Sequence, residues 1–321
     1  MAMSPNVAVL GCGYWGKNLA RNFAELGALV ALSDPDVATA AREAEKNRVP
    51  ARDTSDILAD RAIGAVAIAA PAEHHAELAL AALAAGKHVF VEKPLALNRE
   101  DGEAIVAAAQ GAGRILMVGH LLRYHPAFEA LLSTVRSGRI GRLRYAYSHR
   151  LSLGKLRVEE NVLWSFAPHD VSMLLALFGE RPDRVEARGG SFVTPGIEDE
   201  HRLDMTFPGG GRAHVFASWL HPFKEHRLVV VGEKGMIVFE DSAADPKQKL
   251  RLYAHGMNRS GRAPEPVKAE PEPIAFGLAE PLKQECSHFL DCISSNAQPR
   301  TDGTEALAVL DVLLRAGETR A

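Results

Sequence analysis

The sequence predicts an α/β protein of two domains: a doubly wound parallel sheet, then an α/β domain with a large, open, mainly antiparallel sheet. Three observations support this fold class. The chain has 321 residues, about twice a typical single-domain length. Up to about residue 121, short apolar runs alternate with helical patterns, which is typical of a parallel sheet whose strands are connected by helices. Further on, β-like runs follow one another directly, which favours an antiparallel or mixed sheet.

The chain opens with a predicted strand–helix–strand unit. NVAVL at 6–10 is a short apolar run, KNLARNFAEL at 17–26 has a helical pattern, and a second apolar run covers 28–32. Together these segments span about 30 residues, which is the size of a βαβ unit. The alternation continues with predicted helices at 36–47, 74–86 and 99–113 and predicted strands at 64–70, 88–94 and 114–120.

After residue 122 the pattern changes. Helices are predicted at 126–141 and 162–178, and two amphipathic helices at 280–295 and 304–318. The segment 258–274 is rich in Pro, Arg and Glu, so we expect a surface loop there. The predicted strands of this part are 143–151, 184–193, 198–207, 211–220, 225–240 and 249–255.

The composition narrows the function classes. A formal net charge of -3 without a basic stripe argues against nucleic-acid binding. The three cysteines (Cys12, Cys286 and Cys292) form no CxxC pair, which argues against a disulfide framework or structural zinc and favours a cytoplasmic location. We expect no signal peptide and no membrane span, because no basic segment precedes an apolar core and no long apolar window exists. HHAE and HRLD lack a third partner, so we expect no metal site.

A glycine-rich segment, GCGYWG, follows the first predicted strand and opens the first predicted helix. Gly11 permits a tight turn, Gly13 lets the backbone approach a pyrophosphate, and Gly16 allows close helix–strand packing. The helix N-terminus supplies free N–H groups. Asp34 ends the next strand, where a carboxylate binds ribose hydroxyls and repels a 2′-phosphate. This context predicts a Rossmann dinucleotide site with NAD favoured over NADP; the alternative is a glycine-rich turn without a ligand.

Two aromatic residues, Tyr14 and Trp15, lie inside the glycine motif. Either side chain could cover the pyrophosphate of a bound dinucleotide or pack against the protein. Both are therefore candidate cofactor-binding residues, and packing is the favoured interpretation for Trp15.

Lys93 follows a predicted strand of the parallel sheet, in Glu92-Lys93-Pro94. Ligands of open α/β sheets bind beyond the carboxyl ends of the strands. An ammonium group there can hydrogen-bond a substrate hydroxyl and stabilise the negative charge that develops as a hydride leaves. The alternative is a solvated surface lysine.

His169 and Asp170 lie near the start of an apolar predicted helix. An imidazole that titrates near neutral pH suits proton transfer from a sugar hydroxyl. The alternative is a helix-capping or core histidine. His120 and His125 flank Arg123 where the first domain ends, and this cluster either lines a cleft or packs the junction.

Five stretches resemble the Gfo/Idh/MocA oxidoreductase family, which includes glucose–fructose oxidoreductase and inositol dehydrogenase. They are the run containing AGKHVFVEKPL at 69–98, GHLLRYHPAF at 119–128, APHD at 167–170, and the segments 280–290 and 299–310. The resemblance spans nearly the whole chain. AGKHVxxEKPL is much more specific than the glycine motif.

The resemblance implies an NAD-binding Rossmann domain, taken as residues 1–121, and a substrate-binding and oligomerisation α/β domain at 122–321, with the last helix able to pack back on the first domain. It implies catalytic roles for Lys93 and His169. In this family the outer face of the large sheet often mediates dimers or tetramers, so we expect a homodimer or homotetramer. The other implied site residues are Pro71, His75 and Glu92 in the dinucleotide pocket and Arg123 near the substrate cleft, and Lys93 is also a candidate cofactor-binding residue.

The sequence departs from the family pattern at one position. Many members carry an Asp four residues before the catalytic His, and this chain has Ser165. Either His169 is oriented by Asp170 or another group, or Lys93 carries more of the proton transfer. The segment NVLWSFAPHD at 161–170 resembles the corresponding segment of a subgroup of nucleotide-sugar enzymes, such as UDP-N-acetylglucosamine 3-dehydrogenases.

The expected function is therefore NAD-dependent hydride transfer to or from a sugar, most plausibly a nucleotide-activated one at C3. Reduction of a free polyol, an inositol or an imine is an alternative, and a non-catalytic NAD-binding regulator is a third. The basic residues before the predicted helix at 162–178 could meet a diphosphate or form a solvated loop; they are Arg123, Arg150, Lys155 and Arg157. The candidate substrate-binding residues are Lys93, Arg123, Ser165, His169 and Asp170.

Overall fold

The computed structural model of the protein describes residues 5–153 and 156–318, so Lys155 of the basic segment lies outside the described residues. The chain forms two compact units. Residues 1–124 and 279–310 make the first, and residues 125–278 and 311–321 make the second. The first unit is therefore assembled from two separate stretches of the sequence.

The first unit contains a parallel sheet of five strands. They are β1 (Val7–Leu10), β2 (Leu29–Ser33), β3 (Ala65–Ile68), β4 (His88–Glu92) and β5 (Leu116–Gly119). Their spatial order is β2-β1-β3-β4-β5, and every neighbouring pair is parallel. The residues of β1, β3 and β5 are all buried, as in parallel sheets with helices on both faces. The predicted parallel sheet is confirmed.

The segments that connect these strands contain α1 (Gly16–Glu25), α2 (Val37–Asn47), α3 (Thr54–Ala59), the 3-10 turn η1 (Ala72–His74), α4 (His75–Ala84) and α5 (Arg99–Ala112). The unit also contains the 3-10 turn η2 (Leu121–Tyr124), α9 (Pro281–Ser295) and the part of α10 (Gly303–Glu318) up to Leu310. The sequence patterns do not predict α3, η1 or η2. Segments this short cannot show a helical period.

Helix α9 completes the apolar core of the first unit. Phe289 of α9 lies edge-on to Phe90 of β4, with ring centroids 5.8 Å apart, and to Phe23 of α1, at 6.4 Å. Leu282 and Cys286 of the same helix belong to this cluster. Edge-to-face aromatic pairs add stability beyond the area they bury. The core of the nucleotide-binding sheet thus depends on residues close to the end of the sequence.

The second unit contains an open sheet of eight strands, in the order β15-β12-β11-β10-β6-β9-β8-β7. Only β6 and β9 pair in parallel within it, which confirms the predicted large and mainly antiparallel sheet. The strands are β6 (Leu143–Leu151), β7 (Arg184–Gly190), β8 (Glu200–Thr206), β9 (Arg212–Ser218), β10 (Glu225–Gly232), β11 (Met236–Glu240), β12 (Leu250–Tyr253) and β15 (Pro271–Pro273). The helices of this unit are α6 (Pro126–Arg136), α7 (Val162–Phe178) and the short α8 (Pro246–Lys249).

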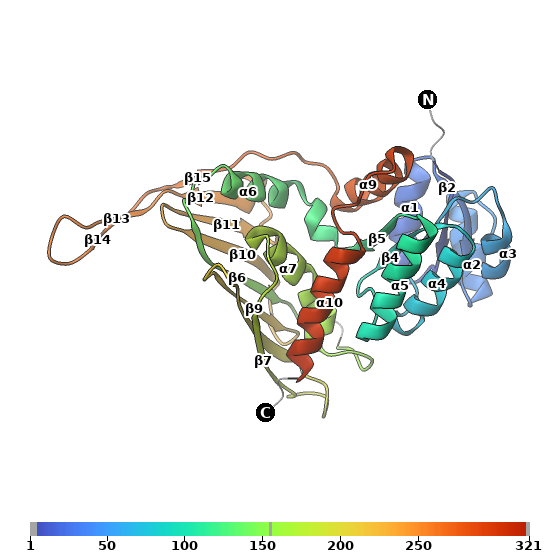
Figure 1. The fold of residues 1–321 in the computed structure, drawn as a ribbon, viewed down its shortest axis with the longest axis horizontal. Coiled ribbons are helices and arrows are strands. Elements are labelled where there is room, and N and C mark those ends of the chain that lie inside the picture. Colours follow the sequence, from blue (N-terminus) through green and yellow to red (C-terminus); the bar gives the residue numbers. More distant parts are fainter. Residues whose placement is uncertain (1–4, 154–155, 319–321) are drawn as a thin grey trace. The chain divides into compact units, whose positions relative to one another are not determined.

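The segment expected to be a plain surface loop contains strands. In the structure β13 (Gly256–Asn258) and β14 (Glu265–Val267) form a two-stranded ribbon, and β15 extends the large sheet (Figure 1). The expectation of an exposed segment holds, since β14 and β15 are exposed throughout. The prolines of this segment argued against strands in the sequence. Proline is nevertheless tolerated on an edge strand that pairs on one side only, as β15 pairs with β12.

Candidate functional site

A cavity of about 600 Å³ lies at the carboxyl ends of β1, β2 and β3 in the first unit. Three loops form it: the glycine-rich turn after β1, the acidic turn after β2 and the Ala-Ala-Pro segment after β3. This is the switch point of a doubly wound sheet, where such folds bind nucleotides. Its lining residues are Leu10, Gly11, Gly13, Tyr14, Ser33, Asp34, Pro35, Thr54, Ala69, Ala70, Pro71, His74, Glu77 and Leu78.

The glycine-rich turn fits a dinucleotide. Gly11 has a φ of +93°, and a Cβ there would lie 2.7 Å from the Ala69 carbonyl oxygen. A Cβ on Gly16 would lie 1.9 Å from the Gly11 carbonyl oxygen, so the helix can start this close to the strand only with glycine. A Cβ on Gly13 would meet no protein atom within 4 Å. Gly13 therefore borders open space in the cavity wall, where backbone can approach a pyrophosphate.

The carboxylate of Asp34 is fixed at the cavity. One of its oxygens accepts the backbone N–H of Cys12 at 2.6 Å and the other accepts that of Asp36 at 2.9 Å. Asp34 therefore ties the end of β2 to the glycine-rich turn and places negative charge beside the cavity. Its position matches the ribose-binding carboxylate of NAD-specific sites and disfavours the 2′-phosphate of NADP.

The two aromatic residues of the motif, Tyr14 and Trp15, have different environments. Tyr14 lines the cavity, and its side chain is 84% exposed. Trp15 packs against the apolar core, and its indole N–H donates to Glu92. Trp15 thus links the glycine-rich turn to the strand end that carries Lys93.

Lys93 directly follows β4, the neighbour of β3, so it lies at the same edge of the sheet as the cavity-forming loops. Its side chain is partly exposed. Burial raises the pKa of the adjacent Glu92 to about 7. His75 is buried, and its ring nitrogens lie 2.7 Å from the Pro94 carbonyl oxygen and 2.9 Å from that of Ala70. His75 thus joins the Lys93 segment to the cavity wall, and burial lowers its pKa.

In the second unit, α7 carries the other candidate residues. Asn161 caps this helix by accepting the backbone N–H of Trp164. Ser165 is buried one turn before His169, and His169 is partly exposed.

Asp170 lies on the side of α7 that faces the large sheet, and it has no exposed surface. Its oxygens accept hydrogen bonds from Arg150 at 2.8 and 3.0 Å and from Ser148. The Asp170 carboxylate is thus hydrogen-bonded by side chains of β6. Direct substrate contact, which the sequence suggested for Asp170, does not fit this burial.

The described basic residues all have acidic partners. Arg123 lies 3.3 Å from Glu305 of α10, which also bonds His120 at 2.7 Å. Arg157 is exposed and pairs with Glu160 at 2.7 Å. The solvated-loop interpretation therefore suits Arg157, whereas Arg150 is a buried structural cation.

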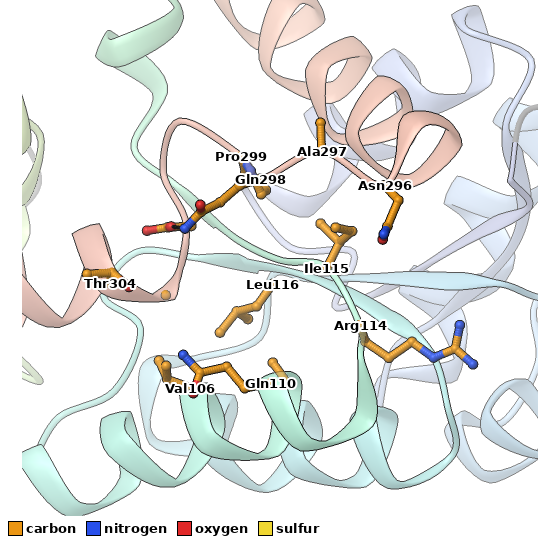
Figure 2. A pocket seen from close by; sticks show the side chains of 13 residues that line it. Val106, Gln110, Arg114, Ile115, Leu116, Asn296, Ala297, Gln298, Pro299 and Thr304 are labelled. Atoms are coloured by element: carbon orange, nitrogen blue, oxygen red, sulfur yellow. Dashed lines mark hydrogen bonds between the residues drawn. The ribbon is translucent and has the colours of Figure 1, made fainter.

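The structure shows features that no sequence motif marks. Thr54 at the start of α3, His74 in η1 and Glu77 in the first turn of α4 line the nucleotide cavity. A second cavity of about 220 Å³ lies between α5, the start of β5 and the segment before α10 (Figure 2). Arg114, Gln110 and Asn296 lie around it in Figure 2, together with apolar side chains.

Two further properties concern the whole described chain. Among residues 5–153 and 156–318, no group of three or more His, Cys, Asp or Glu side chains is arranged to hold a metal ion. Over the same residues, every helix is too short or too polar to cross a membrane.

Comparisons with known proteins agree with this arrangement. The GFO_IDH_MocA model, described as an oxidoreductase family with an NAD-binding Rossmann fold, matches residues 5–120. The model of the GFO/IDH/MocA C-terminal domain matches residues 128–238. The two matches follow one another along the chain and together cover the parallel sheet and strands β6 to β10 of the large sheet.

Individual relatives are also sugar or polyol dehydrogenases. The chain is 28% identical over 310 residues to the UDP-N-acetylglucosamine 3-dehydrogenase of Acidithiobacillus ferrooxidans, covering 96% of this chain and 94% of that protein. A solved structure of that dehydrogenase has a TM-score of 0.86 at 26% identity and covers 98% and 96% of the two chains. Inositol 2-dehydrogenase 2 of Saccharopolyspora erythraea is 34% identical over 220 residues, covering 65% of each protein.

The nucleotide cavity, the fixed Asp34 carboxylate and the two consecutive family matches lead to one assignment. The protein belongs to the Gfo/Idh/MocA family of oxidoreductases, and its N-terminal domain is an NAD-binding Rossmann domain.

Proposed function

We propose that the protein is an NAD-dependent dehydrogenase or ketoreductase of a sugar, and that its substrate is a nucleotide-activated sugar oxidised or reduced at C3. The observation that carries this proposal is the similarity to a UDP-N-acetylglucosamine 3-dehydrogenase over 96% of the chain. The position of Lys93 at the cavity edge of the parallel sheet supports hydride chemistry on an oxygen-bearing carbon.

When NAD is bound, it supplies the hydride acceptor or donor. In the proposed oxidation the neutral amine of Lys93 accepts the proton of the substrate hydroxyl and becomes an ammonium, and in the reduction the ammonium returns this proton to the oxygen. The ammonium charge stabilises the oxygen while negative charge develops on it. His169 is proposed to assist this proton transfer, and Arg123 and Ser165 to contribute to substrate binding. Asp170 holds Arg150 of β6.

Lys93→Ala tests the assignment of the catalytic residue. We expect the turnover number to fall by about 10²–10⁴-fold, the usual contribution of a general acid or base. NAD affinity should stay nearly constant, because Lys93 does not line the nucleotide cavity. The measurements are steady-state kinetics and calorimetric titration with NAD. Unchanged turnover would instead favour a protein in which NAD binding has a regulatory role.

A free polyol such as an inositol is a second candidate substrate. It is favoured by the 34% identity to an inositol 2-dehydrogenase, the higher identity of the two relatives. Initial rates with NAD on a panel of UDP-sugars, inositols and other polyols separate the candidates. Turnover of a free polyol with none of any nucleotide sugar would overturn the leading proposal.

A further inference from the structure

Two of the buried glutamates of the first unit lie on elements whose aromatic residues pack together: Glu92 at the end of β4 and Glu285 in α9. Glu285 has no exposed surface. Among the described residues, no N–H or O–H donor bonds either of its carboxylate oxygens. Buried polar groups are nearly always hydrogen-bonded, so a buried carboxyl in this state has a specific physical cause.

The packing of α9 on β4 brings together the parts of the two elements that carry these glutamates. Phe90 precedes Glu92 by two residues and so shares its face of the strand. Phe289 follows Glu285 by four residues and so shares its face of the helix. The rings of Phe90 and Phe289 are in contact, with centroids 5.8 Å apart. Burial and the nearby charge of Glu92 both raise the pKa of Glu285 well above its usual value.

The two carboxyl groups have unequal surroundings. Glu92 accepts the indole N–H of Trp15 and, at 3.3 Å, the backbone N–H of Lys93. It also has room over Gly119 on β5, where a Cβ would lie 2.9 Å from the carboxylate. N–H donors favour the ionised form. Glu92 is therefore the member that ionises first, and Glu285 is the member that keeps its proton.

We propose that Glu285 is a positioning residue: it stays protonated while Glu92 is ionised, and its O–H donates to the Glu92 carboxylate. Two negative charges in this core would repel each other strongly. A single retained proton removes that repulsion and holds Glu92 between Trp15 of the glycine-rich turn and Lys93. The effect on turnover rests on the proposed role of Lys93, whereas the protonation state of Glu285 does not.

Other titratable groups surround the pair. Burial raises the pKa values of Tyr124 and Cys286, so both stay neutral near neutral pH. The positive charge of Lys93 favours the ionised form of Glu92. The groups one step further away, which act on Tyr124 or Cys286, are Arg123, Arg300, Glu280 and Arg21.

Infrared spectroscopy of the protein without added cofactor tests the protonation state. At mildly alkaline pH, wild-type protein labelled with 13C-glutamate should show the carbonyl band of a protonated glutamic acid. Glu285→Gln should remove this band. Glu92→Gln should retain it, as should Glu280→Gln, a control at the start of the same helix. Absence of the band in the labelled wild type, or its loss in Glu92→Gln alone, overturns the inference whether or not the variants fold well.

Kinetics test the positioning role. Glu285→Leu should lower kcat/KM by about tenfold or more, since a hydrogen bond to a charged group is lost, and should shift its pH profile. Glu285→Gln, which keeps a donor, should restore the wild-type profile. A wild-type profile in Glu285→Leu refutes the positioning role. If no sugar is turned over at all, the proposed function fails, and the infrared result still decides the state of Glu285.

Discussion

Asp34 illustrates how one residue combines structure and specificity. Its oxygens accept two backbone N–H groups, one from the glycine-rich turn and one from its own turn. The remaining lone pairs face the nucleotide cavity that Asp34 lines. The residue therefore shapes the cavity and also supplies the charge that favours NAD.

Asp34→Asn separates these two tasks. The amide oxygen can still accept one backbone N–H, but the charge is lost. We expect NAD affinity to fall by about tenfold and the preference for NAD over NADP to shrink, since hydrogen bonds to charged groups are about twice as strong as neutral ones. Calorimetric titration with both cofactors measures this. Asp36→Asn is the control, because Asp36 caps α2 and does not line the cavity. An unchanged preference in Asp34→Asn would contradict the assignment.

The buried Glu92 predicts a pH-dependent stability. Its pKa is about 7 in the folded protein, against about 4.3 in an unfolded chain. Between these values the folded state binds more protons, so the free energy of unfolding falls as pH rises from about 4.3 to about 7. The expected loss is roughly 3 kcal/mol from this group. Urea denaturation across this range should show a shallower pH dependence for Glu92→Gln, and an identical slope would show that Glu92 is not shifted.

The candidate site residues could be predicted from the sequence where a motif fixes both residue type and position. Gly11, Gly13 and Asp34 belong to this class, and all three line the cavity. Burial and partner choice could not be predicted. Asp170 adjoins His169 in the sequence, yet it bonds Arg150 on strand β6. Glu285 lies in an amphipathic pattern that gives no sign of its unpaired carboxyl.

At the scale of single elements, the turn between β1 and α1 makes different demands on its glycines. Gly16 and Gly11 are in steric contact with backbone, whereas Gly13 borders open space. The same Gly→Ala change should therefore affect folding at one position and ligand binding at the other.

Gly13→Ala should leave the melting temperature nearly unchanged and weaken NAD binding by about tenfold or more, because its methyl group enters the space available to the pyrophosphate. Gly16→Ala should destabilise the protein by several kcal/mol, because its Cβ would lie 1.9 Å from a carbonyl oxygen. Differential scanning calorimetry and NAD titration of the pair check this. Equal effects of the two variants on stability would contradict the steric argument.

The regular elements were largely predictable, because apolar periodicity and glycine stops recur along the chain. The exceptions are informative. Helix α3 is too short to show a helical period in the sequence. Strand β15 contains prolines, which argue against a strand, and it forms by pairing with β12 at the edge of the sheet. Both depend on contacts with neighbouring elements that a local pattern does not contain.

At the scale of the whole molecule, one face of the large sheet in the second unit has an apolar centre. The side chains of Asp170 and α7 meet the opposite face through Ser148 and Arg150. On the outer face, Val229, Val231 and Val238 form an apolar cluster with Tyr147 packed against it. The three valines are buried, whereas the ring of Tyr147 that packs against them is partly exposed, so Tyr147 is a side chain of this cluster that a partner can contact.

We expect this face to mediate a homodimer or homotetramer, as the family resemblance implies. Tyr147→Arg should lower the oligomeric state, because it places an unpaired charge in an apolar contact. Analytical ultracentrifugation measures the change, and Arg184→Glu on the outermost strand β7 is a charge-altering control outside the cluster. A monomeric wild-type protein would rule out this interface.

The return of α9 to the first unit also governs the order in which the chain can fold during synthesis. Phe289, Leu282 and Cys286 belong to the core of the nucleotide-binding sheet, but the ribosome adds them only after residues 125–278. At roughly 5–20 residues per second, the first 124 residues wait about 8–30 s for these partners. The emerging N-terminal half therefore exposes an incomplete apolar core, and chaperones that bind nascent chains have a defined target there.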